Sequence, residues 1–290
     1  MILIYKKIIK HKKLRSIFVW LLYITGFSFL VYPFVSNTYY QWVQKTVSKE
    51  YQEIVAKKND RELETIREKI ELHNDQLVDK QTVTDEANFG IEAERNAQKG
   101  MTAPKREELG AVIAVLEIPK INIELPVYNG TNSQQIANGT GVMKGTSLPF
   151  GGKGTHSVLT SHRGLPTAKL FTDLPELKRK DLFFVKIAGE THAYEIDQIK
   201  VIEPEDFSAL EVVKGKDYIT LLTCTPYMVN THRLLVRGHR VNPYKPELHK
   251  KATKSGYWHQ LKKYILYTLI VLTVFTVFFF VKRYRDRKRP

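Results

Sequence analysis

Cysteine is nearly absent from this chain, because Cys224 is the only one among 290 residues. A single thiol cannot form an internal disulfide, so a disulfide-stabilised scaffold is excluded. The sequence also lacks a cluster of His, Cys, Asp and Glu with metal-ligand spacing, and we expect neither a metal nor another cofactor. The acidic residues Glu203, Glu205 and Asp206 could bind a cation, but we interpret them as a solvated loop. Internal repeats and low-complexity tracts are absent as well.

Excess charge is scarce outside two short terminal segments. Residues 1–35 and 282–290 hold 12 Lys and Arg against one acidic residue, whereas the other 246 residues hold 33 against 29. The net charge of +15 therefore lies mainly beside apolar runs. This distribution is typical of membrane topology rather than of a phosphate-binding face, so we expect no nucleic-acid partner.

Charged residues are missing from two long apolar runs, 16–35 and 264–281. Each run is long enough to cross about 30 Å of hydrocarbon as a transmembrane helix. The first run could instead be a signal peptide, but it exceeds the usual apolar region of about 7–15 residues and lacks a good cleavage site. The basic tails 1–15 and 282–290 place both termini in the cytoplasm. We therefore predict a two-pass protein of the cell membrane whose central domain is extracellular.

Residues 36–109 are predicted to form a helical stalk followed by a lid-like or linker region. Apolar residues recur near a helical period from position 39 to about position 77, and no Gly or Pro interrupts them. The stripe that we expect to pack on the domain consists of Trp42, Val43, Val47, Tyr51, Ile54 and Val55. From position 74 to position 105 the chain is polar and irregular. A second linker, 246–263, is predicted before the second apolar run.

The central region, 110–245, has the pattern of a β domain. Short segments rich in Val, Ile, Leu, Tyr and Phe occur at 111–118, 123–128, 157–161, 182–187, 192–202, 218–224 and 233–241, and a weaker one at 141–144. Short helical turns are expected at 132–138 and 167–174. Roughly eight short strands with few long helices predict an all-β barrel or sandwich.

The lone cysteine ends one of these predicted strands, and Pro226 follows two positions later. A thiol at the exposed end of a strand is placed to react, although free cysteine is often a small buried core residue. The next strand begins near His232. If the two strands pair antiparallel, Arg233 lies almost opposite Cys224. Its guanidinium could then favour a thiolate and donate hydrogen bonds to an oxyanion, whereas an isolated strand arginine would simply be a surface residue.

A cysteine nucleophile also needs a base, which one of the nine histidines could supply. His232 should point to the face opposite Arg233, and His239 lies roughly 20 Å further along an extended strand. His156 and His162 flank another predicted strand and remain the candidates. We favour His162, because it leads into a strand-to-loop exit of the kind that often carries catalytic groups.

Two segments resemble signatures of the sortase family, and of its pilus-assembling class C in particular. Residues 220–240, TLLTCTPYMVNTHRLLVRGHR, resemble the active-site signature, and residues 158–166, VLTSHRGLP, resemble the histidine motif. The resemblance covers about 110–241, and the two predicted membrane anchors agree with it. It implies an eight-stranded sortase-type β-barrel in which Cys224 is the nucleophile, His162 the acid/base and Arg233 the oxyanion stabiliser.

The same resemblance implies a cysteine transpeptidase of Gram-positive pilus assembly. Cys224 would attack the Thr–Gly bond of an LPXTG-like sorting signal in a pilin, and His162 would protonate the leaving amine. The thioacyl intermediate would pass to a lysine amine of another pilin subunit, so pilins and the membrane are the expected partners. A membrane-anchored cysteine endopeptidase that releases its product to water is the alternative. A second alternative is a surface scaffold protein without catalytic activity.

This sequence departs from the class C pattern in the segment that would form a lid over the site. Many class C sortases close the site with a lid that carries an Asp-Pro-aromatic sequence. Here Asp85 and Phe89 offer an acid and an aromatic ring, but no proline joins them and their spacing is wider. We therefore expect residues 78–105 to be mobile and not to lock the cleft.

Overall fold

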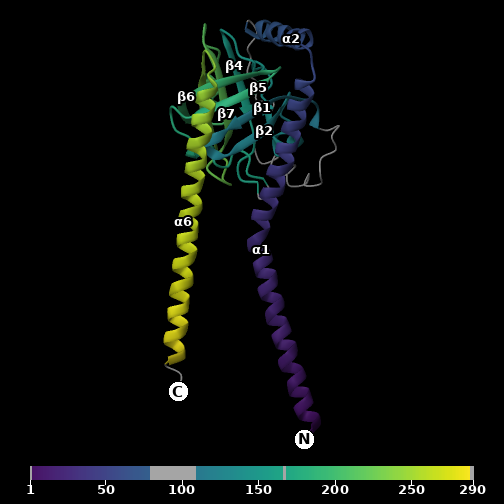
Figure 1. Ribbon diagram of the computed structural model, residues 1–290, viewed down its shortest axis with the longest axis vertical. Helices are drawn as coiled ribbons and strands as arrows, with labels where there is room; N and C mark the ends of the chain where they lie inside the picture. The colour runs from purple at the N-terminus through teal and green to yellow at the C-terminus, as the bar shows by residue number, and fades with distance from the viewer. Residues whose placement is uncertain (1, 79–108, 166–167, 288–290) are drawn as a thin grey trace.

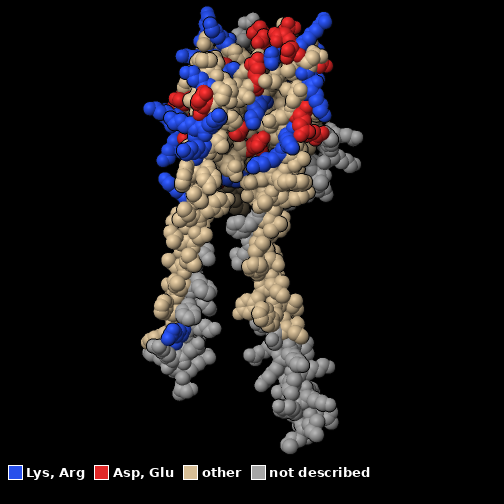
Figure 2. Space-filling view, viewed as in Figure 1, with Lys and Arg blue, Asp and Glu red and all other residues tan. Residues whose placement is uncertain are grey.

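The computed structural model describes residues 2–78, 109–165 and 168–287. A closed barrel carries two long helices that leave it on the same side, so both ends of the chain lie far from the barrel (Figure 1). Acidic and basic side chains cover the barrel end of the molecule, whereas the described parts of the two helices beyond it are largely uncharged (Figure 2). The helical elements are α1 (Ile2–Ala56), α2 (Asp60–Val78), η1 (Pro119–Ile121), α5 (Ser133–Asn138), η2 (Leu174–Glu176), η3 (Ser208–Leu210) and α6 (Pro246–Arg287).

The barrel contains all the strands that the sequence predicts, including the weak one near 141. They are β1 (Val112–Ile118), β2 (Ile123–Tyr128), β3 (Thr140–Val142), β4 (Thr155–Thr160), β5 (Leu182–Ile187), β6 (Glu190–Ile202), β7 (Asp217–Thr225) and β8 (His232–Val241). The strands close in the order β1-β2-β3-β4-β7-β8-β6-β5. Two neighbouring pairs are parallel, β2 with β3 and β4 with β7, and the others are antiparallel. The all-β prediction is therefore confirmed as a barrel.

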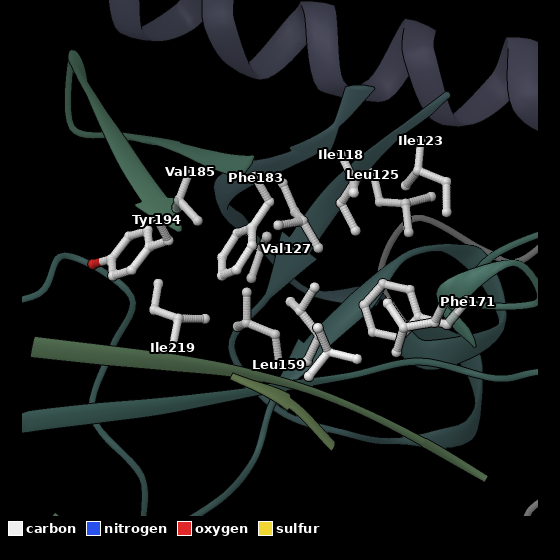
Figure 3. Packing of buried hydrophobic residues seen from close by; sticks show 14 of the residues in the cluster. Ile118, Ile123, Leu125, Val127, Leu159, Phe171, Phe183, Val185, Tyr194 and Ile219 are labelled. Carbon is white, nitrogen blue, oxygen red and sulfur yellow. The ribbon is translucent and has the colours of Figure 1, made fainter. Parts of the chain in front are cut away.

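The interior of the barrel is a packed apolar core (Figure 3). Phe183 and Tyr194 are fully buried and stack with ring centroids 5.4 Å apart. Leu159 on β4 and Ile219 on β7 face the same core. Burying one such side chain stabilises a fold by about 1.5–3 kcal/mol relative to its exposed state. Because side chains fill the interior, a reaction with a large substrate must take place at an end or on the outside of the barrel.

The stalk is two helices, and the prediction of one continuous helix is wrong. α1 ends at Ala56 and α2 begins at Asp60. Between them, Asn59 Oδ1 accepts a hydrogen bond from the Glu62 N–H at 2.9 Å, and Glu62 Oε2 accepts one from the Asn59 N–H at 2.9 Å. This reciprocal capping box starts a new helix without Gly or Pro. As a result the chain turns, and α2 crosses the end of the barrel remote from the chain termini (Figure 1).

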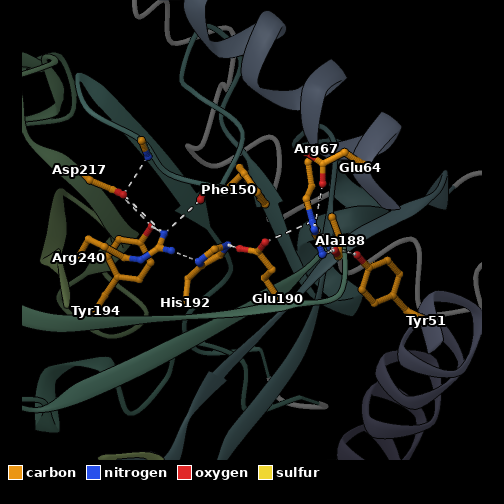
Figure 4. A network of polar contacts seen from close by, with 11 residues as sticks. Tyr51, Glu64, Arg67, Phe150, Ala188, Glu190, His192, Tyr194, Asp217 and Arg240 are labelled. Atoms are coloured by element: carbon orange, nitrogen blue, oxygen red, sulfur yellow. Dashed lines mark hydrogen bonds and ion pairs between the residues drawn. The ribbon is translucent and has the colours of Figure 1, made fainter. Parts of the chain in front are cut away.

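Both stalk helices are tied to the turn between β5 and β6 (Figure 4). Tyr51 on α1 donates a hydrogen bond to the Ile113 carbonyl at 2.6 Å and accepts one from the Ala188 N–H at 3.3 Å. Arg67 on α2 donates from Nε and Nη2 to the Ala188 carbonyl, at 3.1 and 3.0 Å. Arg67 also pairs with Glu190 at 3.3 Å. The predicted packing of the stalk on the domain is thus confirmed for Tyr51, whereas the prediction is wrong for Trp42 and Ile54, whose side chains are exposed.

The polar network continues from this turn into the end of the barrel (Figure 4). Arg240 on β8 contacts His192 Nδ1, donates to Tyr194 Oη at 3.3 Å and pairs with Asp217 at 3.5 Å. Burial, followed by the positive charge of Arg240, lowers the pKa of His192 to about 3. His192 is therefore a neutral structural residue. It lies at the Asp217 end of β7, the end opposite Cys224.

Residues 246–263 do not form a separate linker, because they are the first part of α6. Here the helix packs against η1. A Cβ atom on Gly256 would collide with the Pro119 carbonyl, so a side chain at this position would push α6 away. Further along, Lys263 Nζ pairs with Glu176 at 2.6 Å. These contacts fix the direction in which α6 leaves the barrel.

Within the described ranges, no helix combines the length and the apolar character needed to cross a membrane. The two spans, 16–35 and 264–281, therefore stay predictions.

The contacts of Arg67 lead to a test of stalk docking. Removal of its guanidinium by Arg67→Ala leaves the buried Ala188 carbonyl without its side-chain donor, and we expect a loss of about 1–3 kcal/mol in the free energy of unfolding. Thermal unfolding and the rate of trypsin cleavage within α2 measure this change. Arg61→Ala, an exposed arginine on the same helix, is the control. Equal behaviour of the two variants would refute the anchoring role.

Because His192 is buried in its neutral form, we expect the free energy of unfolding to fall at acidic pH. The pKa of His192 is lowered in the folded state, so the unfolded chain binds a proton first, below pH about 6.5. The stabilisation is fully present above pH 6.5 and is lost as the pH falls towards 3, by about 1.4 kcal/mol per pH unit. Urea titrations between pH 7 and pH 4 measure it. His192→Gln should flatten this dependence, and an unchanged slope would contradict the assignment.

Candidate active site

The predicted pairing of Cys224 with Arg233 is confirmed. β7 and β8 run antiparallel, with Cys224 opposite Arg233 and Thr225 opposite His232. Directly opposed residues lie on the same face of a sheet, about 4.5–5.5 Å apart at Cβ. The thiol and the guanidinium thus share one face of the barrel at the end of β7. Both residues are buried, with 4% and 6% of their surface exposed.

Arg233 is oriented by the loop that connects the two strands. Its Nη1 donates to the carbonyls of Asn230 at 3.2 Å and His232 at 3.3 Å. Among the described residues, no acceptor binds its Nε or Nη2, so these donors are available to a group that enters the site. A guanidinium held at one end and open at the other suits the stabilisation of an oxyanion.

Strand β4 brings His162 to the same end of the barrel. β4 pairs in parallel with β7, with Thr160 beside Leu222. The alignment continues past the end of the ladder, because the Ser161 N–H donates to the Leu222 carbonyl at 3.3 Å and Thr223 Oγ1 donates to the Ser161 carbonyl at 2.8 Å. Ser161 therefore lies beside Thr223, and His162 is the next residue of the chain at this end of β7.

The environment of His162 favours its neutral form. The residue is 4% exposed, and burial lowers its pKa to about 4. Its Nε2 is buried and has no hydrogen-bond partner within residues 2–78, 109–165 and 168–287. At neutral pH the imidazole is therefore uncharged and able to take a proton from a neighbouring thiol.

The rival histidines are engaged elsewhere. His156, at the other end of β4, contacts the Glu211 carbonyl at 2.9 Å and Thr220 Oγ1 at 2.7 Å through its two ring nitrogens. His232 points away from the thiol, as strand alternation predicts, and lies 3.2 Å from Glu203. Of the two candidates that the sequence leaves, His156 thus lies at the end of β7 remote from Cys224, and His162 follows β4 at the Cys224 end.

Cys224 does not lie at an exposed strand end, and that expectation is wrong. β7 continues to Thr225, which still pairs with β8, so the thiol lies inside the ladder. Nor is Cys224 a filler of the apolar core, because it belongs to neither cluster of buried hydrophobic residues. Its neighbour across the β7–β8 ladder is Arg233. A buried thiol flanked by polar groups fits a reactive residue better than a structural one.

One charged residue of this end was missed by the sequence reasoning. Arg163 Nη1 donates to Thr225 Oγ1 at 2.8 Å, and its guanidinium carbon lies 6.0 Å from the centroid of the Tyr227 ring. Arg163 thus touches the residue that follows Cys224. The available signal was its position directly after His162 in the histidine motif.

The remaining predicted site residues are not placed. Asp85 and Phe89 lie outside the described residues, so the prediction of an unlocked lid stays untested. In the part of the chain that the structure describes, no group of three His, Cys, Asp or Glu residues is arranged to hold a metal ion.

Comparison with known proteins gives consistent matches. Residues 116–241 match the sortase domain. Sortase D of Bacillus subtilis is 31% identical over 139 residues, which cover 47% of this chain and 67% of that protein. The pilus-related sortase C of Group B Streptococcus has 40% identity and a TM-score of 0.58, over 68% of this chain and 98% of that one. Clostridium perfringens sortase C, solved with the C-terminal cell wall sorting motif, has 38% identity and a TM-score of 0.56, over 68% and 98%.

The fold, the two motifs and these matches agree. The chain therefore belongs to the sortase family of cysteine transpeptidases, and the solved structures named above are class C sortases.

Proposed function

We propose that this sortase polymerises pilins by cutting an LPXTG-like sorting signal between Thr and Gly and joining the new Thr end to a lysine amine of another subunit. The observation that carries the proposal is the register of β4, β7 and β8, which puts Arg233 opposite Cys224 and brings the segment with His162 to the same end of β7. Two similar chains add support, since one is described as pilus-related and another was solved with a cell wall sorting motif.

In the first half of the proposed reaction, His162 takes the proton of the Cys224 thiol. The thiolate sulfur forms a bond to the Thr carbonyl carbon, and Arg233 donates hydrogen bonds to the oxyanion that develops. When this intermediate collapses, the C–N bond to Gly breaks. His162 gives its proton to the leaving nitrogen, and a thioester between the signal and Cys224 remains.

In the second half, a neutral lysine amine attacks the thioester carbonyl. The new C–N bond is an isopeptide bond, and the C–S bond breaks. The amine proton passes through His162 to the departing sulfur, so the thiol is regenerated. The same three residues would serve a cysteine endopeptidase, in which water replaces the amine as acceptor. That alternative differs from the proposal only in the acceptor.

The nucleophile is tested by mass spectrometry of the full chain after incubation with a sorting-signal peptide. We expect an adduct on Cys224 whose mass equals the peptide up to Thr. Cys224→Ala should form no adduct and should lose all measurable turnover. An adduct elsewhere, or turnover by Cys224→Ala, would disprove the assignment.

The acceptor is tested in the same reaction with an added lysine-containing pilin peptide. The transpeptidase proposal predicts that the isopeptide product grows with the amine concentration at the expense of the hydrolysed peptide. Hydrolysis alone, at every amine concentration, would favour the endopeptidase.

We also propose that residues 16–35 and 264–281 anchor the protein in the cell membrane, with the barrel outside. Several large apolar side chains in the first segment are exposed, among them Phe18, Trp20 and Phe27, and Leu266 and Phe280 are exposed in the second. An apolar surface of this kind needs a cover, and lipid supplies one. The basic residues beyond both segments favour the cytoplasmic side for both termini.

Epitope tags at the two termini test this topology in cells whose wall has been removed. External protease should digest the barrel and leave both tags intact until the membrane is permeabilised. Alkaline carbonate washing should not release the protein. Digestion of either tag in sealed cells, or release by carbonate, would contradict the two-pass arrangement.

A further inference from the structure

Arg163 links the segment that follows His162 to the end of β7, which carries Cys224. It directly follows His162 at the exit of β4, and its Nη1 donates to Thr225 Oγ1 at 2.8 Å. Thr225 directly follows Cys224 at the end of β7. One guanidinium therefore connects the chain just beyond the histidine to the chain just beyond the cysteine.

The loops also touch on the far side of this hydrogen bond. The guanidinium carbon of Arg163 lies 6.0 Å from the centroid of the Tyr227 ring, within the range of a cation–π contact. Gly164 has a φ of +94°, and a Cβ atom there would lie 3.2 Å from Tyr227 Cε2. The ring therefore packs directly over the backbone that follows Arg163, and the contact leaves little room for the two loops to separate.

The segment after His162 also forms hydrogen bonds with residues 171–172. The Gly164 N–H donates to Thr172 Oγ1 at 3.3 Å, and the Phe171 N–H donates to the His162 carbonyl at 3.1 Å. Because both flanks of His162 are fixed, a bond from Arg163 to Thr225 transmits that rigidity to the cysteine side of the site.

Arg163 also has an electrostatic effect on the groups around Cys224. The charged or titratable groups placed around Cys224 are His162 and Arg163 beyond β4, Arg233 on β8, Tyr227 in the β7–β8 loop and Asp173 near η2. Burial lowers the pKa of Arg163, and the negative forms of Tyr227, Asp173 and Cys224 act in the opposite direction. A Coulombic interaction acts equally on both partners. The negative form of Cys224 stabilises the Arg163 guanidinium, so the guanidinium also stabilises the Cys224 thiolate.

We propose that Arg163 is a positioning residue of the sortase reaction, which clamps the loop after Cys224 to the loop after His162 and supplies a fixed positive charge that favours the thiolate. The inference rests on the proposed role of Cys224 as nucleophile. It gives the site a second cation besides Arg233. That cation matters because His162 becomes positive only after it has taken the thiol proton, whereas the charge of Arg163 is present beforehand.

Because Cys224 is the only cysteine, alkylation by iodoacetamide reports this thiol alone. We would measure the alkylation rate of the full-length protein in detergent between pH 5 and pH 10 by mass spectrometry. In Arg163→Gln the midpoint of the pH dependence of alkylation should rise by about 1 pH unit. The kcat of transpeptidation at pH 7 should fall roughly tenfold, with little change in KM. Arg163→Lys should restore most of the midpoint. Arg61→Gln, which removes an exposed charge on α2, should leave it unchanged.

A second variant separates the clamp from the charge. Thr225→Val keeps the guanidinium but removes its acceptor, and we expect a midpoint between those of the wild type and Arg163→Gln. This measurement keeps the proposal testable if Arg163→Gln does not fold.

An unchanged midpoint in both Arg163→Gln and Thr225→Val would overturn the proposal. So would equal losses of activity in Arg163→Gln and Arg163→Lys without any shift of the midpoint, because that result would assign Arg163 a merely structural role. Cys224→Ala separates the proposed role of Cys224 as nucleophile from the proposed role of Arg163. If it retains activity, the proposed nucleophile is wrong. If it is inactive while the midpoint does not move in the Arg163 variants, only the role of Arg163 is wrong.

Discussion

The site depends on the position of β7 between one parallel and one antiparallel neighbour. β4 pairs with β7 as far as Leu222, and His162 follows the end of β4 by two residues. On the other side of β7, β8 places Arg233 opposite Cys224. A slip of one residue in either pairing would turn a partner to the opposite face of the sheet. The register of three strands, rather than any single bond, assembles the site.

The two ends of the barrel have different physical tasks. At the Asp217 end of β7, charged and polar groups bind one another and hold α1 and α2 through Tyr51 and Arg67. At the Cys224 end, donors on Arg233 and a ring nitrogen of His162 have no acceptor or partner among the described residues. His192 Nε2 and Arg240 Nε at the Asp217 end are likewise buried without a hydrogen-bond partner among the described residues, so the contrast between the ends rests on the ion pairs of Arg67 and Arg240. The apolar core between the ends keeps the two sets apart.

Burial has opposite consequences for the proposed base and the proposed nucleophile. It keeps His162 neutral, which suits a proton acceptor, but it also disfavours a thiolate at Cys224. Fixed positive charge opposes the second effect without depending on pH. On the proposed mechanism, Arg233 and Arg163 share this task. The loop that joins β7 to β8 holds Arg233 through the Asn230 carbonyl and contacts Arg163 through Tyr227, while Thr225 at the end of β7 accepts from Arg163. That loop therefore couples the geometry of the site to its electrostatics.

The sequence by itself determined the strands, the core and the pairing of Cys224 with Arg233, because an antiparallel pair joined by a short loop is set by local spacing. It carried the capping signal at Asn59 and Glu62, which we overlooked. Only the tertiary structure showed that His156 is engaged at the far end of β4, that Cys224 is buried, and that Arg163 donates to Thr225. These outcomes depend on the parallel pairing of β4 with β7, whose contacting residues lie 62 positions apart, and pairing over such a separation leaves no local pattern in the chain.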